Sequence, residues 1–176
     1  MEKRKIHIKR ASINDAVSIA LLGRITFTET FGDLFSDKKD LLEYLERTFA
    51  VDKIEKGIEK DNNVFFIAFM DKLPVGYGKL KLHSENKFLE DSNICQLQKI
   101  YVLQDFLSLG IGKQLHSCLL KKAIDLGFNA IWLSALDSNQ RAIDFYINYG
   151  YQSIGKHGYT IGKDDFELYV MHKKFN

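Results

Sequence analysis

The pattern that most constrains this chain is a strand, a glycine-bearing loop, a helix and a second strand within residues 94–136. The apolar run from Ile94 to Val102 predicts the first strand, and residues 110–126 predict a helix that Gly127 stops. A second apolar run, Ala130 to Leu136, follows after only a few residues. Two strands joined through a helix lie parallel, because a crossover returns the chain in the same direction. We therefore expect an α/β protein built around one parallel strand pair.

The flanking sequence adds helices before this unit and strands after it. The expected elements are a strand at 6–10, helices from Ser12, over 36–49 and over 52–60, a hairpin of 64–69 with 75–82, a loop over 83–93, a helix from Ser138 or Asn139 to Gly150, and strands near 151–156 and 166–171. Neither repeats nor linker-like stretches interrupt the 176 residues. We expect one domain over residues 1–176, which is long enough to fold without disulfides or metal.

Composition narrows the class of function. The net charge of +2 gives no basic footprint, so no nucleic-acid partner is expected. The N-terminus lacks a signal peptide, and no apolar run approaches the roughly 20 residues of a membrane helix. Two cysteines in apolar runs suit a reducing compartment, so we expect a cytoplasmic protein without membrane association. The five histidines lack metal-ligand spacing, and no metal is expected.

The loop before the central helix carries two glycines, Gly110 and Gly112. Glycines at a helix start let a ligand approach the backbone, and the free N–H groups there favour an anion such as phosphate. The sequence does not match two known phosphate-binding motifs. Leu115 replaces the third glycine of the dinucleotide fingerprint, and Leu107 and Gln114 stand where the P-loop requires Gly and Ser or Thr. A plain strand-to-helix turn is the alternative.

A second motif, N-x-x-A-x-x-F-Y-x-x-x-G-Y, runs from Asn139 to Tyr151. Together with the strand, loop and G-I-G-K helix start, it resembles the GNAT superfamily of N-acetyltransferases. Shorter strings resemble the bacterial branch that acetylates spermidine and spermine: 26–31, 131–133, 155–157 and 162–165. The resemblance implies a mixed, mostly antiparallel central sheet with a splayed parallel strand pair and flanking helices.

The resemblance also implies acetyl-CoA as the cofactor and assigns residues to it. Backbone N–H groups of the loop would hold the pyrophosphate, although Leu107 replaces a polar residue of the family pattern. The pantetheine arm would run beside the first strand, Asn139 would hydrogen-bond it, and Tyr146 would lie near the sulfur. The full cofactor set is Ile100, Tyr101, Val102, Leu107, Ser108, Leu109, Gly110, Ile111, Gly112, Lys113, Asn139, Ala142 and Tyr146.

Catalysis and acceptor binding follow from the same resemblance. Tyr146 would be the general acid that protonates the thiolate, because transfer from a phenol to a thiolate is uphill by only about 2 kcal/mol. Gln98 stands where many relatives carry Glu, and an amide cannot serve as a base. The expected acceptor site is formed by Glu29, Asp33, Tyr77, Gln98, Trp132 and Tyr159. For Glu29 and Asp33 a solvated helix end is the alternative.

The predicted function is acetyl transfer from acetyl-CoA to a primary amine of a small molecule, with a polyamine favoured. Gln98 and Leu107 keep open a non-catalytic CoA-binding module on the same fold. An acetyltransferase for a protein N-terminus or another amine, and a nucleotide-dependent enzyme that uses the G-I-G-K turn, are further alternatives. A homodimer is compatible with this interpretation.

Overall fold

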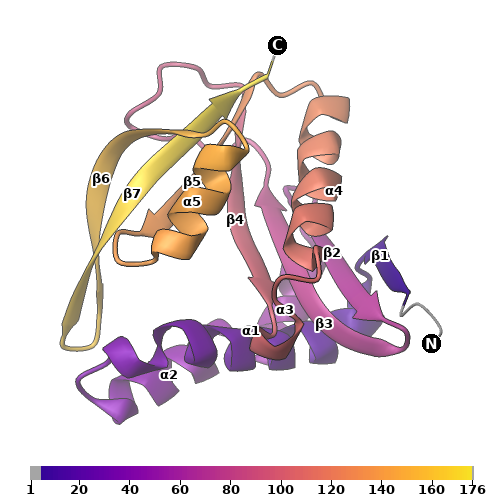
Figure 1. Cartoon of the computed structure of the whole chain (residues 1–176), viewed down its shortest axis with the longest axis vertical. Coiled ribbons are helices and arrows are strands. Elements are labelled where there is room, and N and C mark those ends of the chain that lie inside the picture. Colours follow the sequence, from indigo (N-terminus) through magenta and orange to yellow (C-terminus); the bar gives the residue numbers. More distant parts are fainter. Residues whose placement is uncertain (1–4, 176) are drawn as a thin grey trace.

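A seven-stranded sheet in the order β1-β2-β3-β4-β5-β7-β6 organises the computed structural model, which describes residues 5–175 (Figure 1). Neighbouring strands are antiparallel except β4 and β5, which are parallel. The strands are β1 (Ile6–Arg10), β2 (Asn63–Met70), β3 (Leu73–Lys81), β4 (Ile94–Val102), β5 (Ala130–Leu136), β6 (Gln152–Ile161) and β7 (Asp164–Lys174). The predicted fold class is confirmed, including the parallel pair around the central helix.

Five α-helices flank the sheet: α1 (Ala16–Phe31), α2 (Lys38–Thr48), α3 (Val51–Glu59), α4 (Ile111–Asp125) and α5 (Gln140–Asn148). The predicted helix start after Ser12 is a short 3-10 turn that leads into α1, where the Ser12 N–H donates to Asp15 at 2.8 Å. Asp37 is the N-cap of α2, and its side chain accepts from the Lys39 N–H at 2.9 Å. Local capping chemistry therefore sets these boundaries.

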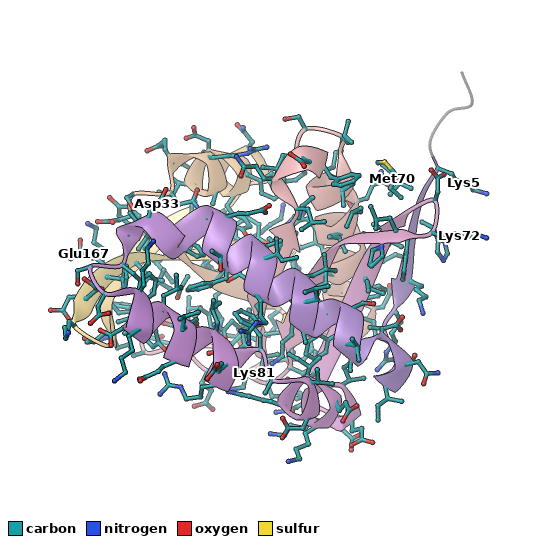
Figure 2. The ribbon with its side chains drawn as sticks, turned by 90° about the horizontal axis from the view of Figure 1, so that it is seen from below. Lys5, Asp33, Met70, Lys72, Lys81 and Glu167 are labelled. Carbon is teal, nitrogen blue, oxygen red and sulfur yellow. The ribbon has the colours of Figure 1, made fainter. Side chains whose placement is uncertain are left out.

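The helices divide between the two faces of the sheet (Figure 1). Leu115 and Leu119 of α4 and Tyr146 of α5 are buried on the face that carries Leu80 and Leu133. On the other face, Phe65, Ile67 and Tyr77 pack against Ile19 and Ala20 of α1. Figure 2, seen from below, shows α1 and α2 side by side across this second face. Each helix presents its apolar side to one surface of the sheet.

The two parallel strands separate partway along their length. Their pairing runs from Ile94 with Ala130 to Gln96 with Trp132 and continues no further in the described chain. Beyond that point β4 is half-exposed or exposed at every residue from Gln98 to Val102, although it is a central strand. We call residues 98–102 the open segment of β4. The antiparallel register with β3 also shifts between Lys79 and Leu80, which leaves Gln98 as an extra residue in β4.

The C-terminal hairpin is longer than the sequence pattern predicts. β6 continues to Ile161 and β7 begins at Asp164, so Gly162, with a φ of 58°, lies in a tight turn. The turn docks on the start of α2, where the Lys163 N–H donates to Asp40 at 2.9 Å and its ammonium donates to Asp37 at 2.7 Å. β6 is an edge strand exposed on much of both faces, so its residues lack the alternation that marks a half-buried strand.

Among the described residues, every helix is too short or too polar to span a bilayer.

Candidate active site

The first turn of α4 presents backbone N–H groups to solvent. Gly110 precedes the helix with a φ of 80°, and Gln114 is the first residue whose N–H bonds back, to Gly110 at 3.1 Å. The N–H groups of Ile111, Gly112 and Lys113 therefore have no intrahelical acceptor. This turn carries no acidic residue, so nothing in it neutralises the positive end of the helix.

The loop before α4 has room for a bound anion. A Cβ added to Gly110 would meet nothing within 4 Å, and one at Gly112 would only reach Val102 at 4.0 Å. Ser108 also has a positive φ, 66°, and Leu109 is exposed, so the loop bends sharply outward before the helix. The Leu107 N–H already donates to Gln104 at 3.1 Å. The donors open to an anion thus begin at Ser108, one residue later than predicted.

Asn139 lies on the opposite side of the open segment, between β5 and α5. Its side-chain oxygen accepts from the Ala142 N–H at 3.2 Å and caps α5, as Asn commonly does at a helix start. The side-chain amide then keeps its donors for a ligand, while Ala142 is partly buried against the core. Asn139 therefore caps the helix that carries Tyr146, and its side-chain NH2 group can still donate to a ligand.

Tyr146 is buried on the inner side of α5, with 7% of its surface exposed. Its ring packs edge-on against Phe145 and Tyr151, at centroid distances of 5.3 and 5.4 Å. Burial raises the pKa of Tyr146 well above that of a free phenol, so the hydroxyl keeps its proton across the physiological range. It is placed to donate a proton or a hydrogen bond, and not to accept a proton.

Further tyrosines surround the open segment of β4. Burial raises the pKa of Tyr101, and the neighbouring hydroxyls of Tyr44 and Tyr146 add to the shift. Tyr101 and Tyr77 also contact each other edge-on, with ring centroids 5.8 Å apart. The contact is therefore an aromatic pair between β3 and the open segment of β4.

The sequence predicted that Tyr77 lines the acceptor site. In the structure its side chain reaches no accessible surface. Its side chain is fully buried beneath α1, where a Cβ at Gly23 would lie 3.0 Å from the hydroxyl. That hydroxyl is the buried side-chain polar atom without a hydrogen-bond partner in the described chain. The reason is packing, because Gly23 lets α1 approach β3 closely over the ring.

Trp132 is likewise a core residue, with 8% of its surface exposed. It packs with Ile94 and Val170, and its indole N–H donates to the Ser84 carbonyl at 2.7 Å. The loop over residues 83–93 covers it, so we do not retain Trp132 as an acceptor-binding residue. Sequence alone gave no sign that this polar loop folds back over β5.

The remaining predicted acceptor residues are dispersed. Glu29 accepts from the Gln104 N–H at 3.0 Å and so caps the 3-10 turn after β4. Asp33 is exposed in the turn after α1, and Tyr159 is 48% exposed on β6. Gln98 is exposed in the open segment, where its amide offers no base. Of this set, Gln98 lies nearest in sequence to Ile100, Tyr101 and Val102.

Two groups of residues near the open segment escaped the sequence analysis. The Ser134 hydroxyl of β5 and His157 Nε2 of β6 are hydrogen-bonded at 2.9 Å. Lys79 and Lys99 are directly opposed on β3 and β4. Lys79 and Ser134 alternate along their strands with core residues, Lys99 lies opposite Lys79, and His157 is bonded to Ser134, so all four share the sheet face of α1 to α3. The residues of each group are far apart in sequence, so only the strand register brings them together.

Comparisons with known proteins agree with this architecture. The sequence model of the Acetyltransferase (GNAT) family matches residues 26–151. An uncharacterised N-acetyltransferase of Lactobacillus delbrueckii subsp. lactis is 27% identical over 168 residues, which cover 96% of each protein. The crystal structure of the PaiA N-acetyltransferase from Thermoplasma acidophilum in complex with coenzyme A superimposes with a TM-score of 0.78 at 20% identity, covering 97% of this chain and 99% of that one. The ribosomal-protein-alanine N-acetyltransferase of Brucella melitensis has a TM-score of 0.68 at 17% identity, covering 96% of this chain and 99% of that one.

The sheet with its separated parallel pair and the free N–H groups at the start of α4 fit an acyltransferase that uses coenzyme A. The family match covers more than half of the chain, and the chain belongs to the acetyltransferase (GNAT) family. It is an N-acetyltransferase whose cofactor is acetyl-CoA. The residues present fit this cofactor, because free N–H groups at α4 suit its pyrophosphate and the space over Gly110 and Gly112 is clear.

The helix start gives a matched pair of glycine substitutions. Gly110→Ala and Gly127→Ala each place a side chain on a left-handed residue, with φ of 80° and 78°, and neither Cβ meets an atom within 4 Å. Both should cost about 1–2 kcal/mol of stability. Only Gly110→Ala should also weaken coenzyme A binding, by roughly tenfold or more. Calorimetric titration of both variants with coenzyme A checks this, and equal affinities would exclude Gly110 from the binding surface.

Proposed function

We propose that this acetyltransferase acetylates a primary amine of a small molecule and that Tyr146 donates the proton needed by the leaving sulfur. The observation that carries the proposal is the buried Tyr146 side chain on the inner side of α5, the helix that follows β5, the strand from which β4 separates. Burial keeps this phenol protonated, and because its raised pKa makes full transfer to a thiolate more uphill than from a free phenol, we propose that it donates the proton as the C–S bond breaks.

Acetyl-CoA, when bound, would supply an acetyl thioester as the electrophile for the amine and a thiolate as the leaving group. Beyond Gln96, no strand within residues 5–175 pairs with β4 on its β5 side, so an N–H there can stabilise negative charge on an oxygen. Tyr146 holds the proton for the sulfur. The amine nitrogen must lose one proton, which Gln98 cannot accept.

His157 is our candidate for accepting the amine proton. Its Nε2 is bonded to the Ser134 hydroxyl at 2.9 Å, and Nδ1 lies 3.3 Å from the Gly158 carbonyl oxygen. If Nδ1–H donates to that carbonyl, Nε2 is the unprotonated nitrogen, and Ser134 donates to it. Both side chains are half-buried on the acceptor-facing side of the sheet. A proton can then pass from the amine through the hydroxyl to the imidazole.

The geometry of the predicted acceptor residues gives little support to the polyamine substrate that the local resemblance predicts. Its distal ammonium groups were expected to bind Glu29 and Asp33. The Glu29 carboxylate instead caps the turn after β4, and Asp33 lies exposed beyond the end of α1. Spermidine and spermine therefore remain acceptors to be tested alongside other amines.

A thiol-release assay with acetyl-CoA tests the proposal against a panel of amines. The panel contains spermidine, an alkylamine, amino acids and a peptide with a free N-terminus, and we expect turnover with at least one small primary amine. Coenzyme A binding without turnover of any amine would favour the non-catalytic alternative. Turnover of the peptide alone would replace the small-molecule acceptor with a protein N-terminus.

A further inference from the structure

Two half-buried lysines lie side by side on the acceptor-facing side of the sheet. Lys79 and Lys99 occupy directly opposed positions in the antiparallel pair β3–β4. The Lys79 ammonium lies 5.2 Å from the centre of the Phe65 ring, and that of Lys99 lies 4.9 Å from Phe49 and 5.4 Å from Tyr101. Like charges at opposed positions destabilise a strand pair, so this arrangement has a cost in free energy.

No carboxylate offsets that cost within residues 5–175. The ion pairs of the described chain involve other lysines, and neither Lys79 nor Lys99 takes part in one. Burial lowers the pKa of both lysines to about 8, and the nearby ammonium groups of Lys53, Lys60 and Lys81 contribute. The charges that act on the two lysines in the described chain are those of other lysines, and the aromatic rings stabilise the ammonium groups only in part. A bound anion would relieve the repulsion.

The lysine pair lies next to the candidate site of acetyl transfer. Lys99 belongs to the open segment of β4, two residues before Tyr101, and its ammonium contacts the Tyr101 ring. Lys99 and Tyr101 both lie beyond Gln96, the last residue of β4 that pairs with β5 in the described chain. A ligand group held by Lys99 therefore lies at the open segment of β4, where acetyl transfer is proposed.

Given the proposed acetylation of a small amine, we propose that Lys79 and Lys99 bind an anionic group of the acceptor, so that the preferred substrate is an amine that also carries a carboxylate or a phosphate. The anion neutralises the two unpaired ammonium groups. The amine at the other end of the acceptor then points toward Tyr101 and Tyr146. A Lys ammonium binds a carboxylate and a phosphate alike, as a point charge. Experiment must therefore decide which of these two groups the acceptor carries. A polyamine would instead bring further positive charge to this position, which like-charge repulsion disfavours.

The variants Lys79→Met and Lys99→Met keep the apolar stem of each side chain and remove its charge. Both should fold, and their melting temperatures should equal or exceed that of the wild type, because each removes an unpaired half-buried charge. Lys72→Met is the matched control. Lys72 lies in the exposed β2–β3 turn, and Figure 2 shows it at the opposite end of the molecule from Asp33 and Glu167.

Anion binding is measured first without any acetylation. With coenzyme A saturating its own site, inorganic phosphate and acetate are titrated while the melting temperature is followed. At least one anion should raise it for the wild type and Lys72→Met, and fail to do so for Lys99→Met. A rise in melting temperature with phosphate indicates a phosphate-bearing acceptor, and a rise with acetate indicates a carboxylate-bearing one. Equal responses of all variants, or no response of the wild type, would overturn the proposal.

Acetylation of matched amines forms the second readout. γ-Aminobutyrate is compared with butylamine, and aminoethyl phosphate with ethylamine. The anionic member of at least one pair should have the higher kcat/KM, and each lysine variant should lower that value by at least tenfold while leaving the plain amine unaffected. Preference for spermidine that is unchanged in Lys99→Met would contradict the proposal. If no amine is acetylated but Lys99-dependent anion binding persists, the anion site stands and the proposed function fails.

Discussion

Tyr146→Phe should lower kcat by roughly 10²–10⁴, the range for loss of a general acid. The substitution removes only the hydroxyl from a buried ring, so packing against Phe145 and Tyr151 is preserved. Affinity for acetyl-CoA should change little. Because burial raises the pKa of Tyr146, its deprotonation should cause no fall in wild-type activity through mildly alkaline pH. Steady-state kinetics from pH 7 to about 9.5, with coenzyme A binding by calorimetry, check both statements.

Tyr151→Phe is the control for this prediction. It removes a buried hydroxyl from the same aromatic cluster, and that hydroxyl is hydrogen-bonded to His116 Nε2 at 3.0 Å. We expect it to cost about 1 kcal/mol of stability and to leave kcat unchanged. A Tyr146→Phe enzyme with wild-type kcat at every pH would show that water or another group protonates the sulfur.

Protonation of His116 should destabilise the protein by about 3 kcal/mol between neutral pH and pH 4. Burial lowers the pKa of this histidine from 6.5 to about 4, and the nearby Lys173 charge contributes. A histidine with a depressed native pKa favours folding in its neutral form. Its contribution is therefore fully present above pH 6.5 and is lost as the pH falls toward 4.

Urea unfolding at pH 7 and pH 4.5 measures this dependence. Carboxylates also titrate in this range, so the informative quantity is the difference between wild type and His116→Gln. The variant should lose much less stability on acidification, whereas His7→Gln, which alters an exposed histidine, should behave like the wild type. Identical slopes for wild type and His116→Gln would show that His116 is not held neutral by its surroundings.

Local patterns in the sequence predicted the elements and, through the family resemblance, the residues proposed for the cofactor side of the site. Apolar periodicity and the glycines around α4 predicted the β4-α4-β5 unit, and the Asn139 motif predicted the helix that carries Tyr146. These features depend on residues close in sequence: the caps, the left-handed Gly110 and the free N–H groups of the first helical turn. They therefore appear without knowledge of any distant contact.

Only the tertiary structure decided the acceptor side. The point where β4 leaves β5, the loop that covers Trp132, the bond from Gln104 to Glu29 and the opposed pair Lys79 and Lys99 all join segments remote in sequence. A strand pattern states which residues share a face, but it does not state which residue of another strand lies opposite. Register and helix docking fix those neighbours, and through them the charge and burial that distinguish a binding surface from the core.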